Sequence, residues 1–534
     1  MAALRNCSFV CIPFLALLSA PMARASEDPA QALADRIDEL LGRVLKTKGV
    51  TPAPAADDAE YLRRVYLDLA GRIPRIDEVR DFLADKHADK RQRLVTRLLA
   101  GPAHARHASQ TLRAFLVPQA SANPRLQHLA VSLEAWLRPR IRAGRGYDAL
   151  VREMLTAPLD YHDRPANAAG PPLVSSPIAF YQANDLKAET VASSAARLFL
   201  GIKIECAQCH DHPFAQWTRR QFWETAAFFA GVPPLEANAA RPAPDDMPLS
   251  LRFRLRIPDQ NTMVAARFLD GGEPDWDARP DPRRLFADWM TARNNPYFAR
   301  MAANRIWAQL FGVGLVDPID DFGPHNKPSH PELLDELARA FADNGCDERF
   351  LLRALTRTAS YQRTSRADHP DQEDARLFAR MNVKGLSAEQ LFDSLALATG
   401  YRDPVPLAAR PAFGWERDSP RGQFVAKFGG ASRRTDQQAS ILQALALMNG
   451  KWLARQTDLA HGETLRAVAD APFLDDKGRL ETLYLATLSR TPRPEELRRL
   501  GAYLERAASA DERRKALADV FWTLLNSNEF LLNH

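Results

Sequence analysis

Helical periodicity dominates this sequence and restricts the chain to a mainly α fold. Apolar residues recur at intervals of three and four positions, as Leu62, Val65 and Leu69 do, and this spacing places them on one face of a helix. Helix stop signals follow such stretches: Gly71 ends the example just given, and Pro74 prevents its continuation. Similar stretches recur from residue 30 to the end of the chain, so we predict a mainly helical protein.

One region, residues 232–280, interrupts this pattern. It begins rich in Pro and Ala, and residues 249–259 then alternate apolar and polar side chains, which is typical of a strand. Together with residues 262–272, this segment predicts a short β-hairpin. Because 534 residues exceed the size of one ordinary hydrophobic core, we expect two helical domains, residues 26–231 and 281–534, joined by this Pro-rich linker.

The first 25 residues have the organisation of a secretory signal peptide. Arg5 precedes an apolar stretch over residues 9–18, and the small residues Ala23 and Ala25 form an A-x-A cleavage site. We therefore expect an exported protein that is periplasmic, located at the cell surface or secreted. Further along the chain, no apolar run reaches the roughly 18 residues that a membrane span needs, so we predict no transmembrane segment after cleavage.

The charge balance does not favour a nucleic-acid partner. Cleavage after Ala25 would remove Arg5 and Arg24 and no acidic residue, so the formal net charge would fall from +5 to +3. Such a charge is small for a chain of this length. The sequence also lacks the GxSxG, P-loop, HExxH and dinucleotide-binding motifs, so common hydrolase, kinase and dehydrogenase chemistries have no support in the sequence.

The motif CAQCH at residues 206–210 carries the main functional signal. CxxCH is the attachment signature of c-type haem: Cys206 and Cys209 would form thioethers, and His210 would bind the iron. We therefore predict a haem c cofactor and a role in electron transfer or a redox-linked process of the cell envelope, with a redox partner protein.

Other occupants would use the same atoms. Zinc or iron could bind the thiolates and imidazoles of Cys206, Cys209, His210 and His212. A disulfide between the two cysteines would suit an oxidising compartment, and an exported structural or interaction protein would then be the alternative function. Cys209 with a nearby histidine could also act as a nucleophile. The residues alone leave these alternatives open.

Aromatic residues follow the motif at high density. Six of the sixteen residues from Phe214 to Phe229 are aromatic, where the overall content of 8% predicts about one. They could form the apolar wall of a haem site or the core of two packed helices. A second axial ligand to the iron would have to come from a distant residue, and the candidates are Met247, Met263, His162, His325 and His330.

A second polar cluster lies between residues 317 and 330. Its ionisable residues are Asp317, Asp320, Asp321, His325 and His330. Asp320, Asp321 and His325 could bind a divalent metal, and the protein would then be a metal-dependent hydrolase of extracellular polymers.

The residues of this cluster favour a structural interpretation over a functional one. Ser329 and Glu332 have the spacing of a helix capping box, with Pro331 in the first turn. Arg305 could pair with Asp320 or Asp321 in a buried contact. Cys346, which follows a glycine at a helix end, is expected to be a small buried residue.

The chain also resembles two bacterial domain families. Residues 30–231 are similar to the domain of unknown function 1549, with RRVYLDLAGRIP, LVTRLLAGP and FLGIKIECAQCHDHPF as the matching segments. Residues 281–534 resemble the domain of unknown function 1553, with NRIWAQLFGVGLVDPIDDFGPHNKPSHPE, YLATLSRTPRPEEL and LLNSNEFLLNH. The resemblance implies an exported protein of the type found in planctomycetes, where such chains often carry an additional cytochrome c-like domain. It implies no particular reaction.

Overall fold

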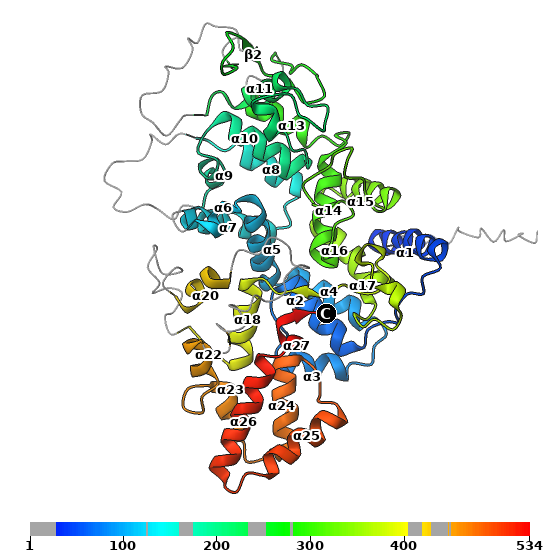
Figure 1. The fold of residues 1–534 in the computed structure, drawn as a ribbon, viewed down its shortest axis with the longest axis vertical. Helices are drawn as coiled ribbons and strands as arrows, with labels where there is room; N and C mark the ends of the chain where they lie inside the picture. The colour runs from blue at the N-terminus through cyan, green and yellow to red at the C-terminus, as the bar shows by residue number, and fades with distance from the viewer. Residues whose placement is uncertain are drawn as a thin grey trace, which may run out of the picture.

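The computed structural model describes residues 28–123, 126–159, 175–232, 253–277, 281–403, 419–428, 447 and 450–534. The predicted signal peptide and much of the predicted linker lie outside these residues. Within them the fold is mainly α, as predicted, and includes two antiparallel sheets of two strands each (Figure 1).

The elements before the hairpin are helices. They are α1 (Pro29–Lys48), α2 (Asp58–Ala70), α3 (Ile76–Ala84), α4 (Lys90–Ala100), α5 (Pro102–Leu116), α6 (Gln119–Ala122), α7 (Gln127–Arg142), α8 (Tyr147–Leu155), α9 (Ile178–Ala183), α10 (Ala188–Ala195), the π-helix η2 (Ala196–Leu200), the 3-10 helix η3 (Glu205–Gln208), α11 (Arg219–Ala226) and the 3-10 helix η4 (Ala227–Phe229).

The later elements begin with the hairpin and are again mostly helical. They are β1 (Arg254–Arg256), β2 (Met263–Ala265), α13 (Pro282–Met290), α14 (Phe298–Phe311), α15 (Pro331–Asp343), α16 (Glu348–Arg357), α17 (Ala359–Gln362), η5 (Pro370–Gln372), η6 (Ala375–Leu377), β3 (Lys384–Gly385), α18 (Ala388–Thr399), α20 (Pro420–Phe428), α22 (Lys451–Gln456), α23 (Glu463–Ala469), α24 (Asp476–Leu488), α25 (Pro494–Glu505), α26 (Ala510–Leu525), α27 (Asn528–Leu531) and β4 (Leu532–Asn533).

The stop signal after α2 is confirmed and has a packing reason. Gly71 caps this helix with φ +69°, a conformation that glycine adopts more readily than other residues. A Cβ atom at this position would also lie 2.5 Å from Nδ1 of the buried His107. Gly71 therefore both ends α2 and allows α5 to pack closely against the turn.

The predicted hairpin is present between the two helical parts of the chain. Strands β1 and β2 pair antiparallel, with Leu255 opposite Val264. Val264 and the neighbouring Ile257 are buried, while Met263 on β2 is 47% exposed. Both strands contact α11, so the hairpin covers one side of that helix.

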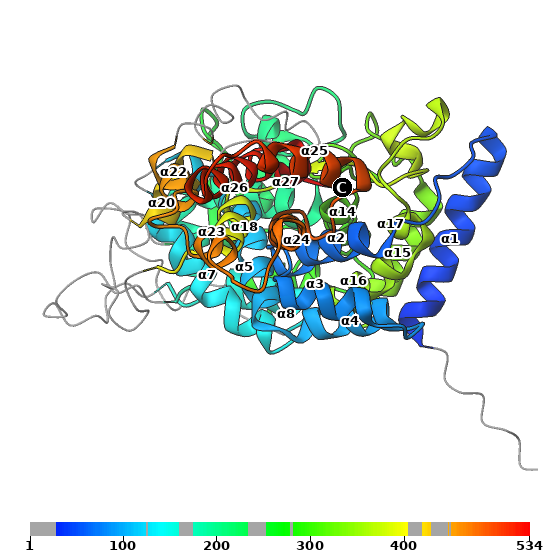
Figure 2. The same cartoon turned by 90° about the horizontal axis from the view of Figure 1, so that it is seen from below.

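Two hydrophobic cores are built from segments that are distant in sequence. The first joins buried residues between Ala30 and Met381 with Leu485, and the second joins buried residues between Leu386 and Phe530 with Leu67 and Ile73. Helix α1 packs on α15 and α16, and α24 contacts α3. In both views α1 and the pair α20 and α22 lie at opposite edges of the molecule (Figures 1 and 2). The domain boundaries at 231 and 281 stay a prediction.

A buried polar network links α2 to the end of the chain. The side chains of Asp68 and Lys384 are both fully buried, and Lys384 Nζ lies 2.8 Å from Asp68 Oδ1. Asn533 Nδ2 donates to the same oxygen at 2.8 Å, and Tyr361 OH donates to Asp68 Oδ2 at 2.9 Å. Lys384 also pairs with Asn533 across β3 and β4. One carboxylate therefore connects four segments of the fold.

Across the helices of the described residues, none is both long and apolar enough to cross a membrane.

Candidate functional site

The CxxCH motif begins on the short 3-10 helix η3, and buried residues in and beside this helix pack in the first core. The π-helix η2 ends at Leu200 and is capped by Gly201, and Ile202, Ile204 and Ala207 are buried in the first core. The thiols of Cys206 and Cys209 are free and exposed. Cys206 lies within η3 and Cys209 caps its C-terminal end, so the two exposed cysteines are about one 3-10 turn apart.

The two histidines of the motif adopt different hydrogen-bonding states. Nδ1 of His210 lies 2.8 Å from the carbonyl oxygen of Asp211, which can only accept, so Nδ1 donates and Nε2 is the nitrogen left for a ligand in the neutral ring. Nδ1 of His212 accepts from the Phe214 amide at 3.1 Å, so its neutral ring carries the hydrogen on Nε2. His210 can therefore act as a ligand through Nε2, while His212 orients the turn.

Helix α11 holds the far side of the turn. A capping box begins this helix: the Thr218 side chain accepts from the Gln221 amide, and the Gln221 side chain accepts from the Thr218 amide. The Asp211 carboxylate accepts from the Arg219 amide at 2.7 Å, and Trp223 Nε1 donates to the Gln208 carbonyl at 3.1 Å.

Four of the six aromatic residues belong to the core rather than to an exposed apolar wall. Phe222, Trp223, Phe228 and Phe229 are at most 5% exposed. Phe228 stacks on Phe268 with ring centroids 5.0 Å apart. Phe214 differs, since 77% of it is exposed beside the motif. The core interpretation is therefore correct for most of this cluster.

The second polar cluster meets the motif segment across the two halves of the chain. Lys203 Nζ lies 3.0 Å from Asp321 Oδ2. Arg197 Nε lies 3.8 Å from Asp320 Oδ2 and 3.7 Å from Glu205 Oε1. The predicted pairing of Arg305 with Asp320 or Asp321 is wrong, because these carboxylates face the cations that precede the motif.

A backbone contact reinforces these ion pairs. The Phe322 amide donates to the Gly201 carbonyl at 2.7 Å. Gly201 has φ +68°, and a Cβ atom there would lie 2.4 Å from Cδ2 of the Phe322 ring. The loop that contains Phe322 therefore packs directly on the residue that ends η2.

Burial and charge act in opposite directions on Glu205. Partial burial raises the pKa of its carboxyl, and the nearby Arg197 and Lys203 oppose that rise. The side chain keeps 42% of its surface exposed. Glu205, which directly precedes Cys206, therefore belongs to the same group of charged side chains as Asp320 and Arg197.

Other predictions for residues 305–332 need correction. The N-cap of α15 is His330 and not Ser329, because Ser329 Oγ contacts His330 Nδ1 at 3.0 Å instead of capping the helix. Glu332 pairs with Arg36 and Arg43 of α1.

Arg305 and His330 are both buried. Arg305 pairs with Glu348. His330 packs against Phe378, and burial lowers the pKa of its imidazole.

The predicted metal sites are not preassembled. In the part of the chain that the structure describes, no group of three or more His, Cys, Asp or Glu side chains is placed to hold a metal ion. This holds for the motif residues and for Asp320, Asp321 and His325, although His325 Nε2 lies 3.3 Å from Asp321 Oδ1. Metal binding stays a prediction. Of the distant iron ligands, Met247 and His162 fall outside the described residues.

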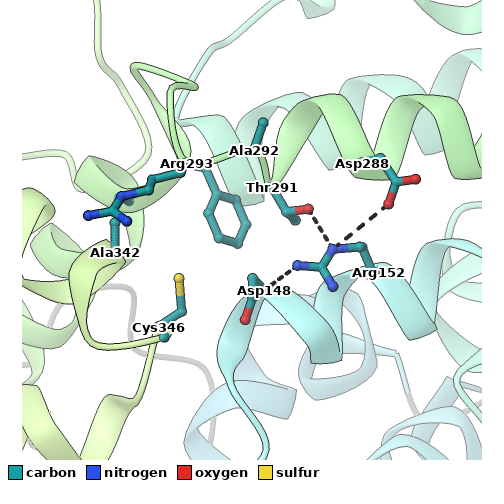
Figure 3. Close-up of a pocket in the computed structure, with 11 residues that line it drawn as sticks. Asp148, Arg152, Asp288, Thr291, Ala292, Arg293, Ala342 and Cys346 are labelled. Atoms are coloured by element: carbon teal, nitrogen blue, oxygen red, sulfur yellow. Dashed lines mark hydrogen bonds and ion pairs between the residues drawn. The ribbon is translucent and has the colours of Figure 1, made fainter.

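A cavity of about 390 Å³ lies away from the motif, between α8, α13 and α15 (Figure 3). Arg152 on its wall pairs with Asp148 and donates to Thr291 Oγ1 at 2.8 Å. Cys346 is buried there, as predicted, and burial raises the pKa of its thiol to about 12. The thiol is therefore protonated at neutral pH and a weak nucleophile. No sequence signal indicated this cavity.

Comparison with known proteins agrees with the two resemblances. Residues 36–233 match the family model of PSCyt2, a protein of unknown function (DUF1549), and residues 282–411 match that of PSD1, a protein of unknown function (DUF1553). No curated protein and no solved structure matches the chain. The CxxCH turn lies in the first matched region, and the loop that packs on it lies in the second. The chain therefore joins a DUF1549 domain to a DUF1553 domain.

Proposed function

We propose that this protein is exported and carries a c-type haem on the CxxCH turn, where it serves electron transfer or a redox-linked process of the cell envelope. One observation supports this proposal most directly. Cys206 and Cys209 are both exposed and about one turn apart, and Nδ1 of the adjacent His210 is hydrogen-bonded to a carbonyl. Two accessible thiols and one oriented imidazole are the groups that the CxxCH signature requires.

The chemistry of these groups fits the attachment. Each thiol adds across a vinyl group, so that a carbon–sulfur bond forms, the thiol hydrogen moves to the other vinyl carbon, and nothing is oxidised. The hydrogen bond from Nδ1 of His210 to a carbonyl fixes the tautomer and increases the basicity of Nε2, the nitrogen that would bind the iron. A bound haem would supply one-electron redox chemistry.

The surroundings suit exchange with another protein. The motif lies at the surface, and the exposed Phe214 provides an apolar contact next to it. The hydrolase alternative has less support, because Asp320 and Asp321 face Arg197 and Lys203 rather than an open site. Nothing favours a nucleic-acid partner.

Production in a bacterium with haem-attachment machinery tests the proposal. We expect one covalent haem per chain by intact mass and the absorption bands of a c-type cytochrome. The C206S/C209S variant should lose the haem, whereas H212Q, which alters only the orienting histidine, should keep it.

A colourless wild-type protein at the mass of the bare polypeptide would refute the proposal. Metal analysis and thiol titration on that sample would then separate bound zinc or iron from a disulfide.

A further inference from the structure

We infer that residues 317–326 of the DUF1553 domain are a positioning element for the CxxCH turn of the DUF1549 domain, with Asp321 as the main positioning residue. The loop would hold the turn in place and balance the positive charge beside it. The redox consequence rests on the proposed function, while the positioning itself does not.

Shape complementarity is the first support. Gly201, five residues before Cys206, has no side chain, and the Phe322 ring occupies the space where one would be. The Phe322 amide also donates to the Gly201 carbonyl. This contact joins residues more than 100 positions apart at the point where η2 gives way to the motif turn.

Charge pairing is the second support. Lys203 and Arg197 precede the motif, and each faces one carboxylate of the loop, Asp321 and Asp320 respectively. The Asp321 and Asp320 side chains are only 17% and 26% exposed, so solvent screens these charges incompletely. Asn326 Nδ2 donates to the Asp321 carbonyl at 3.0 Å and braces the loop.

The position of Lys203 gives the pairing a consequence at the motif. Lys203 is three residues before Cys206, so their Cα atoms are within about 10 Å. With an effective dielectric constant between about 20 and 80, one unit charge about 10 Å from a titrating or redox group changes its equilibrium constant about twofold to sixteenfold. Loss of the Asp321 charge would remove the ion-pair partner of Lys203 and favour the reduced form of a group on the turn. Loss of the Lys203 charge would favour the oxidised form.

Three variants and one control test positioning without haem. D321N, K203Q and the charge swap K203D/D321K are compared with D335N, which breaks an ion pair of Asp335 with Arg300 elsewhere in the same domain. In the haem-free protein, we expect faster amide hydrogen exchange over residues 203–210 in D321N and K203Q, recovery in the swap, and no change in D335N. Unchanged exchange in both D321N and K203Q would overturn the positioning role.

The reduction potential of the haem-loaded protein separates charge from simple support. We expect a higher reduction potential for D321N, a lower one for K203Q, and a value near the wild type for the swap. A tenfold change in the redox equilibrium constant corresponds to ~59 mV for one electron. Shifts in the same direction, or none, would overturn the electrostatic role. If the wild type attaches no haem, the proposed function fails and hydrogen exchange alone decides the positioning role.

Discussion

The contact between Gly201 and Phe322 predicts an unusually large effect of one methyl group. Replacing Gly201 by alanine places a Cβ atom 2.4 Å from the Phe322 ring and forces alanine into φ +68°. The left-handed conformation costs an L-residue about 1–2 kcal/mol, and overpacking typically adds ~1–3 kcal/mol. We therefore expect G201A to lower the free energy of unfolding by about 2–5 kcal/mol.

Gly49 provides a matched control. Its φ is +69°, almost the same, but a Cβ atom there would meet nothing within 4 Å. G49A should therefore show only the conformational part, about 1–2 kcal/mol. In an F322A background, the effect of G201A should fall to the same value, because the ring no longer opposes the methyl group.

Urea unfolding followed by circular dichroism measures these differences. Equal losses for G201A and G49A would refute the packing of the loop on the turn. So would an effect of G201A that is unchanged when Phe322 is alanine.

Three further predictions concern the buried groups of the fold. K384M should lower the free energy of unfolding by about 3–5 kcal/mol, because the Asp68 charge stays buried without its partner. Urea unfolding measures this loss, and the double variant D68N/K384M should recover part of it. F222A should cost about 3–5 kcal/mol and F214A almost nothing, since only Phe222 is buried; similar urea midpoints for the two would contradict the assignment of the core. Burial lowers the pKa of His104 in the folded protein, so the unfolded chain binds the proton first as the pH falls. The contribution of His104 to the free energy of unfolding should therefore be complete above about pH 6.5 and decline at lower pH. H104Q should weaken the decline in the free energy of unfolding between about pH 7.5 and 5.5.

Local signals in the sequence predicted much of the fold. Gly71 after α2 and the capping box of Thr218 act within one turn of the chain, so residue spacing alone indicates them. The hairpin followed from period-two alternation for the same reason. The Ser329–Glu332 capping box failed because Ser329 Oγ contacts His330 and Glu332 is bound by arginines of α1. The second of these is a distant contact, which leaves no local pattern in the sequence.

The site was predictable in its residues but not in its surroundings. The spacing of Cys206, Cys209 and His210 identified the motif, but its contact with Asp321 depends on a tertiary contact without periodicity. Carboxylates and imidazoles in one loop look the same in sequence whether they bind a metal or pair with cations. Aromatic residues can likewise line a cofactor site or form a hydrophobic core. The sequence does not distinguish the two roles, whereas the structure shows that Phe222 is buried and Phe214 is exposed.

The most direct measurement is the mass of one peptide. Trypsin cleaves after Lys203 and Arg219 and releases residues 204–219, which contain both cysteines and His210. From protein produced with the haem-attachment machinery, we predict this peptide with one haem joined to Cys206 and Cys209 through two thioether bonds. The same peptide with two free thiols, or with a disulfide, would contradict the account.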